Sequence, residues 1–263
     1  MQKYNVSLKK IHNIETIKIY EKPVFSGFHS NAIKNNVSYT LSSRQKSNIR
    51  SRRTLNDLIL LNFSQRFTFI TLTFKENISD MEYSNYVFKV FIKKFKYYLR
   101  KKFNNFELKY IAVPELQKRG AIHFHLVTNV PQYVRYIDLI KMWQKSISNN
   151  KHASKKTSGG SLHIKYSNNE TYNTQLIARY LTKYLTKQNE RTEFLGKKTY
   201  FCSRNLKRPI IKKYYLDNSK SLETTLQQLI KNNKVRKKDI QFIDSYLNPY
   251  DNSRVIHIEQ KLN

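Results

Sequence analysis

The sequence brings two imidazoles and a carboxylate together within one short stretch. His123 and His125 are separated by one residue in AIHFHLV, and Glu115 lies shortly before them. Alternate residues of a β-strand share a face, so both imidazoles would project from the same side of a strand. A hairpin that folds about Arg119 would place Glu115 opposite His123, within about 5 Å. This register is a hypothesis, because Pro114 can introduce a bulge there.

These three side chains form a ligand set that suits a catalytic metal. A carboxylate and two imidazoles leave coordination positions open for water and substrate, which a structural site does not need. Taken alone, a pair such as His123 and His125 is more often two surface histidines. The upstream Glu115 strengthens the metal interpretation.

A second group of reactive side chains lies in RYLTKYLTK, residues 179–187. Tyr180 and Tyr184 are four residues apart, which places them one above the other on a helix. Lys183 and Lys187 would lie beside them. An adjacent apolar stripe would be buried, and it consists of Ile177, Leu181 and Leu185. The alternative is that both tyrosines merely border the core.

Together the two groups suggest tyrosine attack on a DNA phosphate. A free tyrosine has a pKa of roughly 10, so a cation and the neighbouring Lys183 would be needed to favour the phenolate. The products would be a covalent phosphotyrosine and a free hydroxyl end. A second tyrosine allows a second cleavage while the first DNA end is still held. We slightly prefer Tyr184 as the first nucleophile, because it lies deeper in the expected helix.

The charge of the chain independently indicates a polyanionic partner. Its 263 residues contain 49 Lys and Arg against 18 Asp and Glu, a net charge of +31. Codon bias could explain part of the lysine excess, but it would not deplete the acids. The basic residues are spread over the whole chain, so we expect a folded surface that is positive and binds nucleic acid.

Several classes of protein are excluded. A single cysteine, Cys202, excludes an intramolecular disulfide and a cysteine-rich zinc site. No apolar run approaches the ~20 residues of a membrane span, and the N-terminus lacks the apolar core of a signal peptide. No P-loop ATPase motif is present. We therefore expect a soluble intracellular protein.

The expected DNA contacts lie in three basic stretches. RQKSNIRSRR, residues 44–53, is interpreted as a solvated loop or as an arm along a phosphate backbone, with equal weight. A Lys/Ser/Gly loop follows at 149–160, and a basic segment lies near 207. The candidate residues are Arg44, Lys46, Arg50, Arg52, Arg53, Lys155, Lys156, Lys207 and Arg208.

Hydrophobic periodicity predicts the elements that would position these groups. Strands are expected at 66–74, 108–115, 121–128 and 161–167, and Thr71 and Thr73 on the first of them would support the site. Helices are expected after an S-x-x-E capping box at Ser79 and Glu82, at 136–147 and at 173–188. The fold class is α+β, with helices packed on a central antiparallel sheet.

The ends of the chain are less regular. A strand is expected at 13–21, followed by a polar segment at 26–56. The tail is expected to hold a helix at 221–232, a short helix at 238–246 and a final strand, VIHIE. We therefore expect a basic N-terminal segment with a strand and a flexible arm at 1–64. A nuclease domain at 65–215 and a small helical extension at 216–263 would follow.

Over residues 65–215 the chain resembles the HUH endonucleases, and within them the rolling-circle replication initiators. FITLTF (69–74) resembles the first family motif, and PELQKRGAIHFHLV (114–127) resembles the metal-binding motif. YLTKYLTK (180–187) resembles the two-tyrosine motif of initiators from microvirus-type phages. SRNLKRP (203–209) resembles a segment that follows this motif in relatives from small phages and plasmids.

The resemblance implies a five-stranded antiparallel sheet with metal and tyrosines on one face. It implies Mg²⁺ or Mn²⁺ held by Glu115, His123 and His125, with Tyr180 and Tyr184 as nucleophiles and Lys183 as their partner. It also implies that one strand is nicked at an origin in single-stranded DNA, which leaves a 5′-phosphotyrosine and a 3′-OH primer. Such a nickase of a phage or plasmid would work in the cytoplasm of a bacterial host with a separate helicase.

Two other interpretations stay open. An HUH transposase or relaxase would use similar motifs, although small transposases usually carry one catalytic tyrosine. A non-catalytic protein that binds single-stranded nucleic acid would use the same charge and aromatic residues, but it has no need for Glu115 or the paired histidines.

Overall fold

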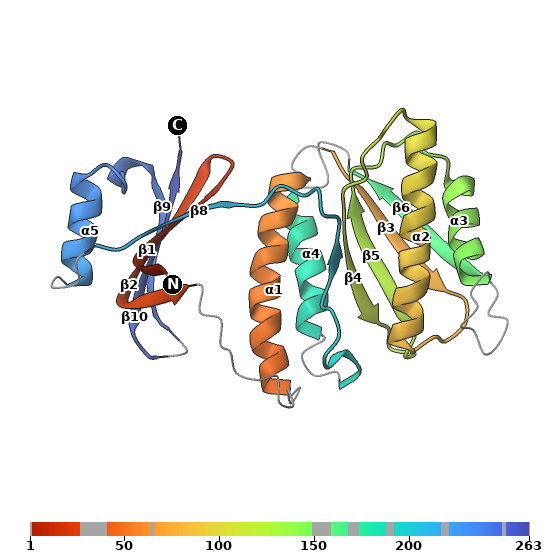
Figure 1. Ribbon diagram of the computed structural model, residues 1–263, viewed down its shortest axis with the longest axis horizontal. Helices are drawn as coiled ribbons and strands as arrows, with labels where there is room; N and C mark the ends of the chain where they lie inside the picture. Colours follow the sequence, from red (N-terminus) through yellow and green to blue (C-terminus); the bar gives the residue numbers. More distant parts are fainter. Residues whose placement is uncertain are drawn as a thin grey trace. The chain divides into compact units, whose positions relative to one another are not determined.

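The computed structural model divides the chain into two compact units, each containing a five-stranded antiparallel sheet (Figure 1). It describes residues 2–26, 41–63, 66–148, 159–167, 174–187, 192–216, 221–248 and 251–262. The larger unit comprises residues 38–207, and the smaller unit joins residues 1–37 to residues 208–263. The α+β class predicted from the sequence is confirmed.

The sheet of the larger unit has the strand order β6-β3-β5-β4-β7, and every neighbouring pair is antiparallel. Its strands are β3 (Thr68–Phe74), β4 (Tyr110–Leu116), β5 (Ile122–Thr128), β6 (Gly160–Tyr166) and β7 (Phe201–Cys202). The interior strand β3 consists of β-branched and aromatic residues apart from Leu72, and such residues pack well on a pleated surface. It pairs with β5 on one side and with β6 on the other.

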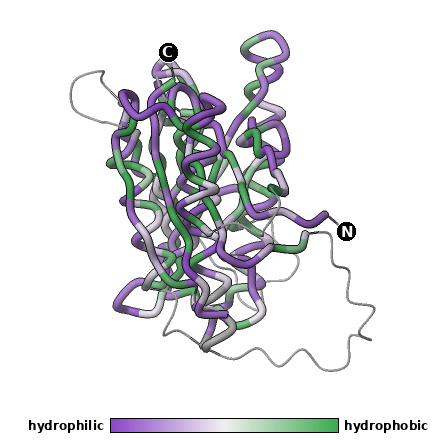
Figure 2. Tube along the Cα trace, turned by 90° about the vertical axis from the view of Figure 1, so that its left-hand side faces the viewer, coloured by the Kyte–Doolittle hydropathy of each residue, from purple (hydrophilic) through white to green (hydrophobic). Residues whose placement is uncertain are grey.

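Helices cover both faces of this sheet (Figure 1). The helices are α1 (Leu41–Asn62), α2 (Met81–Lys102), α3 (Tyr136–Ser148) and α4 (Thr174–Lys187), with a short 3₁₀ turn at Thr192–Phe194. Helices α2 and α3 enclose a core that includes Phe88, Phe124 and Trp143. Helices α1 and α4 enclose a second core on the opposite face, which includes Leu58 and Leu181. Hydrophobic and hydrophilic residues are interspersed along the chain (Figure 2).

The start of α2 differs in detail from the prediction. The N-cap is Asp80, whose side chain accepts hydrogen bonds from the amides of Glu82 and Tyr83, at 2.8 and 3.2 Å. The expected capping box at Ser79 is therefore wrong by one residue. An aspartate satisfies the free amides of a helix start as well as a serine does.

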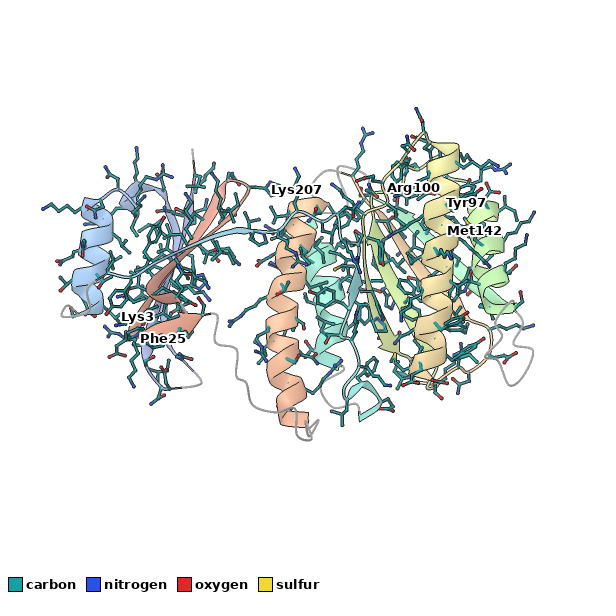
Figure 3. All side chains as sticks on the ribbon, viewed as in Figure 1. Lys3, Phe25, Tyr97, Arg100, Met142 and Lys207 are labelled. Carbon is teal, nitrogen blue, oxygen red and sulfur yellow. The ribbon has the colours of Figure 1, made fainter. Side chains whose placement is uncertain are left out.

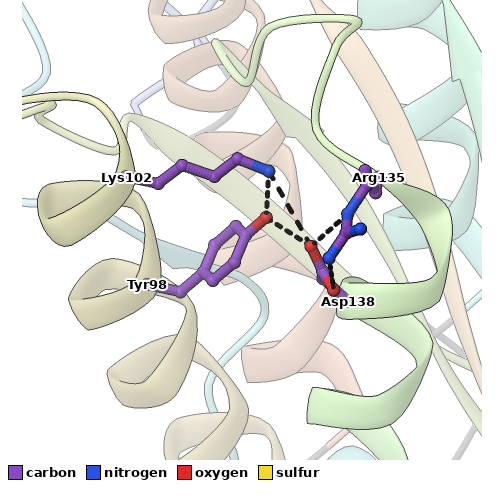
Figure 4. A network of polar contacts seen from close by, with 4 residues as sticks. All are labelled: Tyr98, Lys102, Arg135 and Asp138. Atoms are coloured by element: carbon purple, nitrogen blue, oxygen red, sulfur yellow. Dashed lines mark hydrogen bonds and ion pairs between the residues drawn. The ribbon is translucent and has the colours of Figure 1, made fainter.

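A polar network joins α2 to α3 (Figure 4). Asp138 accepts hydrogen bonds from Tyr98 at 2.7 Å and from Arg135 at 3.0 Å. Lys102 donates to the Tyr98 hydroxyl at 2.8 Å and lies 3.8 Å from Asp138. The network ties the C-terminal end of α2 to the first turn of α3.

The sheet of the smaller unit has the order β8-β1-β2-β10-β9. Its strands are β1 (Gln2–Ile11), β2 (Ile14–Ser26), β8 (Ile210–Tyr214), β9 (Ile240–Leu247) and β10 (Arg254–Lys261). Helix α5 (Leu222–Lys231) packs on one face of this sheet, and a 3₁₀ turn covers Lys237–Asp239. The N-terminal and C-terminal parts of the chain thus share one sheet.

Three expectations for the chain ends need correction. Residues 41–56 were expected to be loop or arm and instead form most of α1, while residues 27–40 lie outside the described residues. The short helix expected at 238–246 is instead the strand β9. The two units also differ from the expected division at residues 64 and 215, because β1 and β2 pair with C-terminal strands. The helix at 221–232 and the final strand are confirmed.

No helix among the described residues is long and apolar enough to cross a membrane.

Candidate active site

The hairpin of β4 and β5 has the register that the sequence predicts. Glu115 pairs directly with His123, and the pairing runs unbroken through Pro114, which faces Phe124. The turn closes with a hydrogen bond from the Gln117 amide to the Ala121 carbonyl, at 2.8 Å. Gly120 in this turn has a φ of 87°, a conformation that glycine adopts without strain.

The two faces of β5 separate the core from the chemistry. Ile122, Phe124 and Leu126 are buried in the core beneath α2 and α3. His123 and His125 project from the opposite face and are 8% and 5% exposed. The period-two prediction for this strand is therefore confirmed, and both imidazoles lie on the side of the sheet that α4 covers.

His125 is fixed from both sides of its ring. Its Nε2 lies 2.8 Å from Oε2 of Glu115, and its Nδ1 lies 3.3 Å from the hydroxyl of Thr71. An ionised carboxylate only accepts, so Nε2 carries a proton and donates it to Glu115, while Nδ1 shares a hydrogen bond with the Thr71 hydroxyl. Thr71, predicted as a supporting residue, thus orients the imidazole. Thr73 pairs with His123 across the strands.

His123 has no such support. Its Nε2 is buried and has no hydrogen-bond partner. Burial lowers the pKa of His123 to about 4, and the nearby His125 and Arg119 act in the same direction. The ring is therefore neutral at pH 7. Leaving a buried polar atom unpaired costs about 1–3 kcal/mol, so an unpaired nitrogen at this position indicates a site for a ligand.

The predicted metal centre is only partly assembled. Among the described residues, no group of three His, Cys, Asp or Glu side chains is placed to hold a metal ion. Glu115 contacts His125 directly and does not point with His123 at a common centre. The convergence of all three therefore stays a prediction. The unpaired Nε2 of His123 and the oxygen and nitrogen donors beside it nevertheless fit a divalent cation.

Both predicted tyrosines face this group from α4. The ring of Tyr184 stacks on His125, with centroids 4.2 Å apart and planes 4° apart. The ring of Tyr180 lies edge-on to Tyr184 and to His125, at centroid distances of 4.9 and 5.9 Å. The four-residue spacing thus places both rings on one face of the helix, against His125.

The environments of the two tyrosines differ. Tyr184 is 6% exposed, and its pKa is raised, mainly by burial and then by a hydrogen bond with Tyr180. Tyr180 is 43% exposed and lines a cavity of about 320 Å³ between α4 and the strands β3 and β6. Because DNA can reach the exposed Tyr180 more easily than the buried Tyr184, the structure favours Tyr180 as the first nucleophile. This argues against the slight preference for Tyr184 that the sequence suggested.

Helix α1 holds α4 in place. The side chain of Asn48 is fully buried, and its amide group donates a hydrogen bond to the backbone carbonyl of Leu185 at 3.1 Å. This bond attaches α1 to the turn of α4 that carries Tyr184. Leu55 and Leu58 of α1 share a core with Leu181 of α4. The segment that the sequence suggested as an arm is therefore a support for the reactive helix.

The other predicted residues fall into three groups. Those exposed to solvent are Lys183 on α4, Arg50, Arg52 and Arg53 on α1, and Lys207 and Arg208 (Lys207 is labelled in Figure 3). Arg44 is buried, donates to the Lys197 carbonyl at 2.7 Å and lies over the Phe194 ring, so its role is structural. The side chain of Lys46, and Lys155 and Lys156 entirely, lie outside the described residues.

Sequence reasoning missed three residues at this site. Phe69 packs against both His125 and Tyr180, with centroids 6.0 and 5.4 Å away. His163 pairs with Thr71 and lines the same cavity as Tyr180. Arg119 donates to the Phe74 carbonyl at 3.0 Å and brings a positive charge near His123. The alternation FITLTF and SLHIKYS could have placed Phe69 and His163 on this face, had the register of β3 and β6 been known.

A comparison of the chain with models of known protein families gives one match. Residues 67–189, which span the strands β3, β4, β5 and β6 and the helix α4, match the model of a family described as Replication-associated protein ORF2. No curated protein and no solved structure matches the chain significantly.

Proposed function

We propose that this chain nicks and rejoins one strand of its replicon DNA, because residues 67–189 match the family of replication-associated proteins, consistent with a rolling-circle replication initiator. The observation that carries this proposal is the position of Tyr180 and Tyr184 against His125. Two phenols beside two imidazoles and a carboxylate can perform phosphoryl transfer through a covalent intermediate.

In the first step the Tyr180 oxygen attacks the scissile phosphorus. The new bond joins Tyr180 Oη to the 5′-phosphate, and the bond from phosphorus to the 3′ oxygen breaks. The phenol proton passes to solvent or to the Glu115–His125 pair, and the departing 3′ oxygen takes up a proton. The products are a 5′-phosphotyrosine and a 3′-OH that can prime synthesis.

The surrounding side chains prepare this attack. The side chains of Tyr184 and Tyr180 share a hydrogen bond, which holds the two hydroxyls close together. Phe69 contacts the Tyr180 ring edge-on and restricts its position. Lys183, exposed on the same helix, supplies positive charge for the DNA backbone.

Glu115, His123 and His125 would hold a divalent cation, Mg²⁺ or Mn²⁺, once the hydrogen bond between Glu115 and His125 gives way to it, and the bound cation would polarise the scissile phosphate. The chain's own residues have separate tasks. Glu115 orients His125, and the neutral ring of His123 offers a lone pair without competition from a proton at pH 7.

Tyr184 would serve the second cleavage. Closing a replicated circle requires attack by a second nucleophile while the first end is still attached to the protein. Tyr184 lies one helical turn from Tyr180, with ring centroids 4.9 Å apart, so both can reach one phosphate site in turn. The tandem arrangement favours an initiator over a transposase or a relaxase. Strand separation would come from a separate helicase.

Incubation with single-stranded oligonucleotides from its own replicon and Mn²⁺, followed by a denaturing gel, tests the proposal. We expect a band of DNA covalently attached to the protein, abolished by EDTA. The double variant Tyr180→Phe/Tyr184→Phe should give no band. Tyr166→Phe is the matched control, because Tyr166 lines the same cavity but lies on β6.

The absence of an adduct with correctly folded wild-type protein would contradict the nicking proposal. If DNA still binds in that experiment, the non-catalytic alternative gains support. If the double variant still forms the adduct, a side chain other than Tyr180 or Tyr184 is the nucleophile.

A further inference from the structure

The sheet of the smaller unit has two unlike faces. One face packs against α5 through Val6, Ile17 and Ile258, which are all buried. The described residues of this unit form no second α-helix, and none covers the opposite face (Figure 1). We call that opposite surface the open face. Its residues come from all five strands, and they include Tyr4, Ser7, Lys9, Lys18, Tyr20, Lys213, Phe242, Asp244, Tyr246, His257 and Glu259.

Aromatic rings form a row across the open face. Tyr20 and Tyr246 both pair with Val255, one from each side, so two phenol rings flank one small apolar residue. Tyr4 meets Tyr20 edge-on, with centroids 5.8 Å apart. Phe242 lies near the β9 edge and is 47% exposed. A sheet surface with several accessible rings is unusual unless something stacks on it.

Lysines interleave with these rings. Lys213 Nζ lies 4.6 Å from the centre of the Tyr4 ring. Lys18 Nζ donates to the Tyr246 hydroxyl at 3.3 Å. Tyr4 and Tyr246 are therefore each accompanied by a cation that can also reach a phosphate.

The charge of the open face is positive. Lys9, Lys18 and Lys213 lie on it, and two acids oppose them. Of these acids, Glu259 is near His257, at 3.4 Å, and Asp244 accepts from the Ser245 amide at 2.8 Å. The cations lie over β8, β1 and β2, so the positive area is continuous at that side of the sheet.

We propose that the open face binds single-stranded DNA, with bases stacked on the tyrosines and phosphates held by the lysines. Unpaired bases expose their faces, whereas those of a duplex are hidden in the base stack, so a row of rings fits a single strand. The net charge of +31 supports a polyanionic occupant. This site lies in a different unit from the tyrosines of α4 and goes beyond the nicking reaction.

Oligo(dT) of about 20 nucleotides is a suitable probe, because it has no secondary structure and needs no origin sequence. Its affinity for the full chain is measured by fluorescence anisotropy without divalent metal. Tyr20→Leu/Tyr246→Leu should weaken binding about tenfold, while Tyr20→Phe/Tyr246→Phe should retain it, since phenylalanine still stacks.

A charge variant tests the phosphate contacts separately. Lys9→Gln/Lys18→Gln/Lys213→Gln should make the slope of log K against log salt shallower by about 2, at ~0.7 per contact. The matched control is Lys231→Gln/Lys237→Gln/Lys238→Gln, which removes three lysines near α5 and should leave the slope unchanged. Duplex DNA should be much less sensitive to the tyrosine variants.

Photocrosslinking with an iodouracil-substituted oligonucleotide locates the contact. We expect crosslinked peptides from β2 and β9. If they come only from the larger unit, or if the leucine variant binds like wild type, the proposal is overturned. A lower melting temperature of the leucine variant with unchanged affinity would likewise oppose it and indicate that the open face is buried in the full chain.

The nicking proposal can fail independently. Binding of oligo(dT) needs neither Mn²⁺ nor the α4 tyrosines, so Tyr180→Phe/Tyr184→Phe should bind like wild type.

Discussion

Tyr184 lies flat against His125, with the two ring planes only 4° apart and their centroids 4.2 Å apart. The stack buries the phenol and covers one face of an imidazole that Glu115 and Thr71 already fix at its edges. Tyr184 is thus part of the support of the site, while Tyr180 beside it is open to the cavity. The two tyrosines should therefore respond differently to substitution.

We expect Tyr180→Phe to lose most first-strand cleavage on a short oligonucleotide. Tyr184→Phe should retain much of it, because phenylalanine preserves the stack on His125. Tyr184→Ala should also unfold more easily, by about 3 kcal/mol, as truncation of a buried aromatic ring leaves a cavity. Covalent adduct formation and thermal denaturation measure the two effects.

Joining should suffer in both single phenylalanine variants, because closing a circle needs two nucleophiles. A strand-transfer assay with two labelled oligonucleotides separates joining from nicking. If Tyr184→Phe joins DNA as well as wild type does, Tyr184 is a structural neighbour and the protein is a nickase with a single tyrosine.

Metal binding should depend on His123. At about 100 times its dissociation constant, Mn²⁺ would add about 2.7 kcal/mol to the free energy of unfolding and raise the melting temperature by several degrees. His123→Ala should lose most of this shift and all cleavage, yet retain most non-specific DNA affinity, which comes from phosphate contacts.

His163→Ala is the control for that variant. His163 lies on the neighbouring strand β6, on the far side of Thr71 from His125, and is exposed. It should keep the Mn²⁺ shift. Equal shifts in wild type and His123→Ala would remove His123 from the ligand set.

The site was predictable where local patterns define geometry. A period of two placed His123 and His125 on one face, and the short turn set the pairing of Glu115 with His123. A spacing of four placed Tyr180 above Tyr184. What the sequence did not reveal is which tyrosine is buried, since this depends on how α4 packs against α1 and the sheet.

The errors arose where tertiary contacts override local composition. Residues 44–53 carry many charges and few apolar residues, so nothing local indicates that they form part of α1. Its second half is anchored through Leu55 and Leu58. Likewise, β2 pairs with β10 from the opposite end of the chain, and β9 forms beside β10. No short-range sequence pattern identifies which strands pair when they are so far apart in the chain.

DNA affinity should fall steeply with salt, and α1 should contribute to it. Arg50→Gln/Arg52→Gln/Arg53→Gln should reduce the slope of log K against log salt by about 2 on single strands, if each arginine neutralises one phosphate. These residues are exposed on a helix that lies beside α4. The control, Lys89→Gln/Lys93→Gln/Arg100→Gln, alters α2 on the other side of the sheet (Arg100 is labelled in Figure 3). Equal changes of slope in both variants would indicate that the net charge of the protein contributes to DNA affinity, whichever helix carries the arginines and lysines.

The network between α2 and α3 should make stability depend on acid pH (Figure 4). Hydrogen bonds from Arg135 and then from Tyr98 lower the pKa of Asp138 below its usual 3.8. A carboxyl with a lowered pKa in the folded state stabilises the protein above the unfolded value, and this stability is lost as pH falls through the folded value. Asp138→Asn should therefore lower the melting temperature at pH 7 by about 1–3 °C, the scale of an accessible ion pair.

That difference between wild type and Asp138→Asn should shrink as the pH is lowered from 5 towards 3, because the wild-type carboxyl then becomes neutral as well. Thermal denaturation across this range checks the trend. Glu193→Gln is the control, since Glu193 is an exposed carboxylate in the 3₁₀ turn outside the network, and its removal should change little at any of these pH values. A difference for Asp138→Asn that stays constant down to pH 3 would show that the substitution disturbs packing between α2 and α3 and that the charge of Asp138 contributes nothing.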